Sequence, residues 1–115
     1  MKLVYGVGIN DADYDVAINE YYTNDEGVKG ERRIWTCPYY SRWMNMLTRC
    51  YSDKFQEGNP TYKGCYVAEE WKTFSNFKEW MVTQEWEGLE LDKDILFVGN
   101  REYGPEKCVF VTKSD

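Results

Sequence analysis

Two kinds of side chain in this sequence could carry chemistry: four cysteines and several closely spaced carboxylates. The cysteines are Cys37, Cys50, Cys65 and Cys108, and none of them forms a Cys-x-x-Cys pair, the spacing typical of a zinc site. Thiols with these spacings are most often buried structural side chains, kept reduced in the cytosol. The alternative is a Zn²⁺ ion held by all four thiols from distant segments.

Asp92 and Asp94 are the carboxylates that could bind Mg²⁺, because this ion prefers oxygen ligands. The chain has no histidine, so a carboxylate would also have to serve as general base, which needs a strongly raised pKa. A second acidic run, residues 11–15, is similar to the opening of a calcium loop. Val16 and Tyr22 stand where that loop needs glycine and glutamate, so we expect a solvated turn.

Basic side chains are concentrated in the middle of the chain, although the net charge is −6. Residues 1–31 hold two basic and seven acidic residues, residues 64–115 hold six and eleven, and residues 32–63 hold six and two. The central segment could present a stripe that faces phosphates. Ion pairs between the three segments are the ordinary structural alternative. The central basic residues are Arg32, Arg33, Arg42, Arg49, Lys54 and Lys63.

The hydrophobic pattern predicts a small single α+β domain, with antiparallel strands and a C-terminal β-hairpin packed on two amphipathic helices. Alternating apolar residues predict N-terminal strands over residues 3–9, 16–22 and 33–35. We expect three parts within residues 1–115: N-terminal strands in 1–35, a helical middle in 36–84 and the hairpin in 89–112.

The first helix is expected to begin near Pro38, because proline is favoured in the first turn. Its apolar face recurs at helical spacing and consists of Tyr40, Trp43, Leu47 and Cys50. Arg42, Asn45 and Arg49 fall on the other side and are expected to stay in solvent. The polar residues 52–64 predict an exposed loop.

The second helix is expected over residues 73–83, with an apolar face of Phe74, Phe77, Trp80 and Met81. Two strands are expected to follow, the first through residues 89–96 and the last over 108–111, with a turn at Gly99 and Asn100.

Two passages resemble a known family. Residues 43–51 (WMNMLTRCY), 62–67 (YKGCYV) and 70–77 (EWKTFSNF) are similar to the region before the nuclease hairpin of phage and bacterial HNH-like proteins. Residues 91–95 (LDKDI), 99–100 (GN) and 103–112 (YGPEKCVFVT) resemble a degenerate HNH hairpin. The resemblance covers most of residues 36–112 and implies a phage protein from a homing-endonuclease lineage.

The departures from that family bear on catalysis. An HNH site uses a histidine base and a bound metal, and this chain has no histidine. Only residues 112–115 follow Val111, so we expect no finger helix to complete the metal site. We therefore expect no cofactor and no cleavage of DNA. A metal-dependent nickase that uses Asp92 and Asp94 is kept as an alternative.

Two non-catalytic functions remain open. The first is DNA binding, in which the six central basic residues contact phosphates and Asn45 or Tyr62 contacts bases or sugars. The second is a small phage effector that binds and inhibits a host nuclease or another DNA-processing or defence protein, with acidic surfaces that mimic DNA. No run of eighteen apolar residues and no signal peptide is evident, so we expect a protein of the host cytoplasm without a membrane partner.

Overall fold

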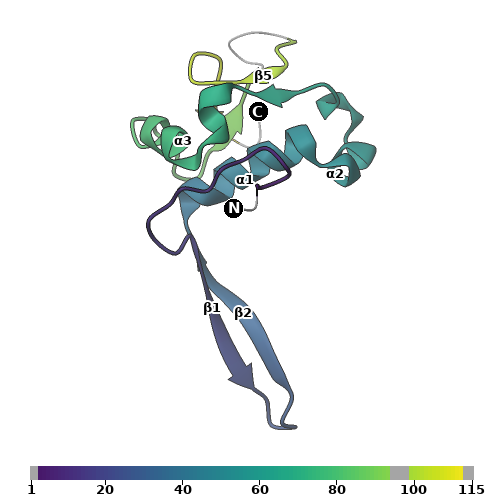
Figure 1. The fold of residues 1–115 in the computed structure, drawn as a ribbon, viewed down its shortest axis with the longest axis vertical. Coiled ribbons are helices and arrows are strands. Elements are labelled where there is room, and N and C mark those ends of the chain that lie inside the picture. The colour runs from purple at the N-terminus through teal and green to yellow at the C-terminus, as the bar shows by residue number, and fades with distance from the viewer. Residues whose placement is uncertain (1–2, 94–98, 113–115) are drawn as a thin grey trace.

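The structure is a computed structural model that describes residues 3–93 and 99–112. A body of helices and short strands carries a two-stranded hairpin that projects away from it (Figure 1). The predicted α+β single domain with antiparallel strand pairs is confirmed. The helices are α1 (Pro38–Tyr51), α2 (Asp53–Gly58) and α3 (Phe74–Met81), with 3-10 turns at Pro60–Tyr62 and Glu69–Lys72. The strands are β1 (Ala17–Thr23), β2 (Lys29–Thr36), β3 (Tyr66–Val67), β4 (Glu90–Asp92), β5 (Glu102–Tyr103) and β6 (Val109–Val111).

Helix α1 begins as the sequence predicts, with Pro38 in its first turn. Its buried face consists of Trp43, Met46, Leu47 and Cys50. The helix ends at Tyr51. The hydroxyl of the next residue, Ser52, accepts a hydrogen bond from the backbone N–H of Phe55 and caps α2. The expectation of a plain loop over residues 52–64 was therefore wrong, because this cap starts a second short helix there.

The predicted strand over residues 3–9 is also wrong. Val4 and Gly8 close a tight turn, in which Tyr5 and Gly6 both adopt positive φ angles. The turn lies against α1, and a Cβ atom on Gly8 would stand 2.7 Å from Cδ1 of Leu47. Packing on the helix thus overrides the period-two pattern that predicted a strand.

Helix α3 forms close to the predicted residues, and the N-terminal segment fixes its start. The N–H of Ile9 donates to the carbonyl of Lys72, and the N–H of Phe74 donates to the carbonyl of Ile9. Asp11 accepts from the backbone N–H of Ser75 at 2.8 Å and from its hydroxyl. Asp11 therefore caps the first turn of α3 while it stays exposed to solvent, as the sequence suggested for this turn.

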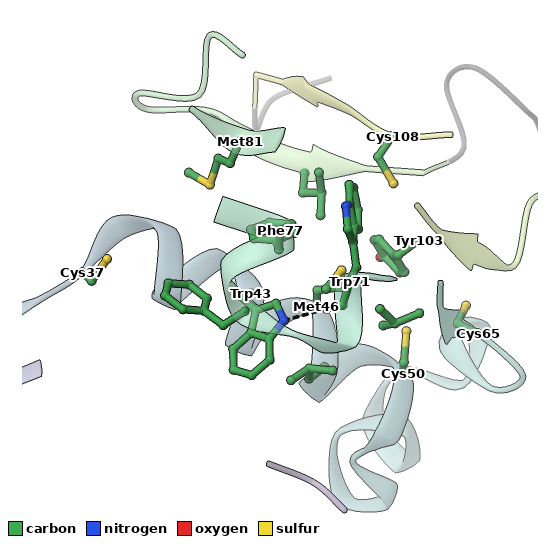
Figure 2. Packing of buried hydrophobic residues seen from close by; sticks show 14 residues of the cluster. Cys37, Trp43, Met46, Cys50, Cys65, Trp71, Phe77, Met81, Tyr103 and Cys108 are labelled. Atoms are coloured by element: carbon green, nitrogen blue, oxygen red, sulfur yellow. Dashed lines mark hydrogen bonds between the residues drawn. The ribbon is translucent and has the colours of Figure 1, made fainter. Parts of the chain in front are cut away.

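The core is an aromatic cluster between α1, α3 and the short strands (Figure 2). The indole N–H of Trp43 donates to the carbonyl of Trp71 at 2.8 Å. The ring of Trp71 meets Phe77 edge to face, with 5.0 Å between centroids. Both tryptophans are almost completely buried, so they join α1 to the segment that leads into α3.

The C-terminal strands pair as predicted, with one addition. β4 lies antiparallel to β6, and Leu91 stands opposite Phe110. β5 was not expected, and it pairs parallel with β3. Asn100 supports the predicted turn because its amide donates to the carbonyls of Lys93 and Glu102. Part of the strand expected over residues 89–96 lies outside the described residues.

The hairpin of β1 and β2 is antiparallel, with a bulge between Ile18 and Asn19. A hydrogen bond from the N–H of Cys37 to the carbonyl of Val16 joins its base to the body. No residue of Ala17–Thr23 or Lys29–Thr36 belongs to the buried core. The radius of gyration is 16.2 Å, whereas a compact domain of this length has about 13 Å. We call residues 17–36 the arm.

Candidate functional site

The arm carries most of the large apolar side chains that the described residues expose. Tyr21 is 77% exposed and Trp35 is 43% exposed, although side chains of this size usually lie in a core. The full set on the arm is Ile18, Tyr21, Tyr22, Val28, Ile34 and Trp35, and the other exposed large hydrophobics are Leu3, Tyr5, Tyr66 and Val82. Such a concentration on one projecting element is typical of a binding surface.

One face of the arm combines aromatic rings with an ion pair. Ile18 stands opposite Trp35 in the register. Nearer the tip, Arg32 binds Glu20 at 2.6 Å, and its guanidinium lies 5.9 Å from the ring centroid of Tyr22. The Tyr22 ring covers Gly30, where a Cβ atom would stand only 2.5 Å from the ring. Because Gly30 has no side chain, the Tyr22 ring can lie against the backbone of the neighbouring strand.

The opposite face carries a polar ladder. The amide of Asn19 donates to Glu31 at 2.6 Å and its oxygen accepts from Nε of Arg33. Arg33 also donates to the hydroxyl of Thr36 at 3.2 Å. Arg32 and Arg33 therefore lie on opposite faces of the arm, and each already has a partner within it.

The arginines of α1 are not in solvent, contrary to the sequence-based expectation. Arg42 is half-buried and donates from Nη2 to the carbonyls of Trp86 and Leu89, both at 3.4 Å. Its guanidinium lies 5.0 Å from the ring centroid of Trp86. The chain folds back over α1 through residues 84–91, and this segment covers the helix face that the amphipathic pattern assigned to water.

Arg49 is held in the same way, one donor reaching the carbonyl of Leu91 at 3.2 Å. Burial of Arg49 opposes its charge. The interaction with the Tyr103 phenol outweighs this effect and raises the pKa of Arg49. Burial in turn raises the pKa of Tyr103 well above its ordinary value. Arg49 therefore stays cationic inside a partly buried site.

Three of the predicted nucleic-acid-binding residues meet at one pocket between α1 and β4. Its volume is about 240 Å³. We call it the arginine pocket, and its lining residues are Ser41, Arg42, Asn45, Arg49, Leu89, Glu90 and Leu91. Asn45 is exposed at this pocket, as expected.

Lys54 and Lys63 are exposed but belong to neither surface. Lys54 lies on α2 and Lys63 follows the 3-10 turn Pro60–Tyr62. The predicted basic stripe is thus divided among the arm, the arginine pocket and the α2 region. Only Arg42, Asn45 and Arg49 are brought together.

The carboxylates proposed for metal binding do not form a site within the described residues. Asp92 lies in β4 opposite Val109, and Asp94 lies outside the described residues. Among residues 3–93 and 99–112, no three Cys, Asp or Glu side chains are arranged to hold a metal ion.

All four cysteines are buried free thiols, as the first interpretation of their spacing expected. Cys37 lies apart from Cys50, Cys65 and Cys108 (Figure 2) and makes a 3.2 Å contact with the hydroxyl of Tyr14. The four-thiol zinc site is therefore not formed. Burial raises the pKa of Cys50 and of Cys108 to about 12, so both remain protonated at neutral pH.

The residues of the arm that the sequence did not single out are the apolar ones. A signal was present, because Tyr21–Tyr22 and Ile34–Trp35 are adjacent apolar pairs, which place apolar side chains on both faces of a strand. Such a strand needs a cover on each face, and the described part of the chain supplies neither.

Comparison of the chain with protein-family models, with curated proteins and with solved structures finds no match. The resemblance to HNH-like proteins therefore stays a prediction. Across residues 3–93 and 99–112, no helix combines the length and apolar character needed to cross a membrane.

Proposed function

We propose that this protein is a non-enzymatic binding protein whose arm inserts into a cleft of a partner protein. The observation that carries the proposal is the set of exposed apolar side chains on the arm, which includes Tyr21, Ile34 and Trp35. Tyrosine, tryptophan and arginine dominate the energy of protein interfaces, and the arm holds all three. Of the two non-catalytic functions expected from the sequence, the geometry favours the protein partner.

The charges of the arm explain why a protein suits it better than DNA. Arg32 is ion-paired with Glu20, so its charge is already compensated within the arm and it would release few counterions from a phosphate backbone. The turn at the tip contains Asp25 and Glu26, which would enter a DNA groove first and be repelled.

The same charges define the partner by its chemistry. A cleft with apolar walls would accept the rings of Tyr22 and Trp35, and a basic floor would attract Asp25 and Glu26 at the tip. Nucleases and other DNA-processing proteins of the host have basic clefts, since they bind phosphates. They are therefore the partners that we propose, with the arm occupying the cleft in place of DNA.

Anchor side chains on the arm can supply part of the binding energy. Buried aromatic or arginine anchors at an interface contribute about 2 kcal/mol or more each. An isolated two-stranded hairpin is only marginally stable in water, so binding would also order the arm. Trp35 and Tyr22, spaced along one face, could each supply such an anchor.

The test is site-specific photo-cross-linking in bacterial cells. Tyr21 is replaced by benzoylphenylalanine in one variant, and Tyr66, an exposed tyrosine of the body, is replaced in a matched control. The proposal expects one discrete protein adduct from position 21 that is absent from position 66, and mass spectrometry then identifies it as a DNA-processing protein.

Three results would contradict the proposal. Nucleic acid in the adduct from position 21 would favour the DNA-binding alternative. An adduct with a second copy of the chain would make the arm a self-association element. Equal cross-linking from positions 21 and 66 would mean that the arm has no specific partner.

A further inference from the structure

We infer that the arginine pocket is a binding site for a phosphate group, carried by a small organic phosphate such as a nucleotide or by the end of a nucleic-acid strand. This inference does not depend on the function proposed for the arm. It rests on the polar side chains of Ser41, Asn45 and Arg49, which line one pocket, and on the two arginines that lie there.

The two guanidinium groups give the pocket its charge. A guanidinium has five N–H donors, and the carbonyls of Pro38, Trp86 and Leu89 take three of those of Arg42. Arg49 uses one on the carbonyl of Leu91. Neither arginine forms an ion pair with a described carboxylate, and among the described residues the groups that accept hydrogen bonds from Arg42 are neutral carbonyls.

Two neutral donors complete the lining. Within residues 3–93 and 99–112, neither the amide of Asn45 nor the hydroxyl of Ser41 has a hydrogen-bond partner. Ser41, Asn45 and Arg49 are spaced by four residues along α1, so their side chains project from the same face of the helix. Along this row, neighbouring donors could bind the phosphate and another polar group of the same ligand.

Glu90 restricts the ligand further. Its carboxylate is exposed at the rim of the pocket and acts electrostatically on Arg49. This charge would weaken binding of inorganic phosphate, because two anions would then share the site. A phosphate ester with a hydroxyl or amino group could instead donate to Glu90, and a pocket of about 240 Å³ has room for more than a phosphate. The ligand is therefore expected to be an ester.

A purely structural role is the main competitor. Arg42 and Arg49 fasten residues 86–91 to α1, and this alone could account for their burial. The backbone carbonyls do not satisfy everything, however. Nε of Arg42 is buried without any partner in the described structure, and a clamp has no need of the amide of Asn45.

The experiment is a ¹⁵N-NMR titration of the full chain with inorganic phosphate, with 5′-AMP and with a short oligothymidylate that has or lacks a 5′-phosphate. The key variant is Asn45→Asp, because Asn45 is exposed and bonds to no described residue. Lys54→Gln is the matched control, since it changes the net charge equally at an exposed position outside the pocket. Glu90→Gln tests whether the carboxylate at the rim of the pocket weakens the binding of inorganic phosphate.

We expect shifts in the amide signals of residues 41–49 and 89–91, and tighter binding of 5′-AMP than of inorganic phosphate. Asn45→Asp should weaken binding about tenfold or more. Glu90→Gln should tighten binding of inorganic phosphate about three- to tenfold, as loss of one nearby carboxylate charge at a partly exposed site would give. Lys54→Gln should change affinity by less than about twofold. The 5′-phosphorylated oligothymidylate should bind better than its unphosphorylated form if strand ends are the source.

Two results would overturn the inference. If no ligand shifts the signals of residues 41–49, the arginines are only a clamp. If Lys54→Gln weakens binding as much as Asn45→Asp, the attraction comes from the general charge of the chain and not from the pocket.

Discussion

The separation between body and arm predicts that one substitution, tryptophan to phenylalanine, has very different effects at two positions. Trp43 is completely buried, and its indole N–H donates to the carbonyl of Trp71. Trp35 lies on the arm, with 43% of its surface exposed and no indole hydrogen bond to a described residue. Trp43→Phe should therefore destabilise the fold, and Trp35→Phe should not.

The magnitude follows from what each change removes. At Trp43 the smaller ring leaves a cavity of about 40 Å³, which costs about 1 kcal/mol. Loss of the donor to a buried carbonyl costs about 2 kcal/mol more. The sum is about 3 kcal/mol, which corresponds to about 12 °C in Tm for a chain of this length. At Trp35 the expected cost is below about 0.5 kcal/mol.

Urea unfolding followed by far-UV circular dichroism measures both values, since this signal does not depend on tryptophan fluorescence. The m-values should stay equal, because neither change alters the surface exposed on unfolding. A loss at Trp35→Phe comparable to that at Trp43→Phe would refute the reasoning, because it would mean that the arm packs on the body.

Further predictions concern the arm, the N-terminal segment and the thiols. Trp35→Ala and Ile34→Ser should each lower cross-linking from position 21 at least about tenfold, with Tm unchanged by thermal melts; a parallel loss of Tm would contradict this. Gly8→Ala should cost about 1–3 kcal/mol in urea unfolding, because its Cβ atom meets Cδ1 of Leu47 at 2.7 Å; a neutral result would mean that the N-terminal turn does not pack on α1. Asp11→Ala should cost about 1 kcal/mol by loss of the α3 cap, and Asp13→Ala is its matched control. Burial raises the pKa of the Cys50 and Cys108 thiols to about 12; these thiols ionise first in the unfolded state, so the free energy of unfolding should fall as the pH rises from about 9 towards 12. A Cys50→Ala, Cys108→Ala variant should show a shallower fall above pH 9, and the same slope as the parent chain would refute the assignment.

The helices were predictable because strong local signals agree with the final packing. Pro38 in the first turn of α1 and the spacing of Trp43, Leu47 and Cys50 specify both the start of this helix and its buried face. The same holds for α3, whose buried residues include Phe74, Phe77 and Met81. Local propensity and tertiary burial select the same conformation at these positions.

The errors occur where tertiary contacts decide the outcome. Residues 3–9 alternate like a strand, but the close approach of Gly8 to α1 imposes a turn. The helical pattern predicted that Arg42 and Arg49 face solvent. Instead, a segment more than forty residues further along the chain covers this face of α1. Helical periodicity reports which side of a helix is apolar, but long arginine side chains can be covered on the polar side as well.

The arm shows a different limit of prediction. Its strands were expected, and β1 and β2 do pair. Their projection from the body was not expected, because the pattern of a strand does not state whether another element covers it. Tyr21, Tyr22, Ile34 and Trp35 would suit a buried strand equally well. Only the three-dimensional arrangement shows that they are left exposed.

The most direct test of the central claim is removal of the arm. In a shortened variant, Asn-Gly replaces residues 18–35 and connects Ala17 to Thr36, which face each other in the register and suit a two-residue turn. The full chain and the shortened chain are then compared in two ways. The first is how much of the partner identified by cross-linking each chain binds, and the second is the Tm of each chain. The account predicts a Tm within a few degrees of the full chain and loss of the partner. A folded shortened chain that still captures the same partner would contradict the assignment of binding to the arm.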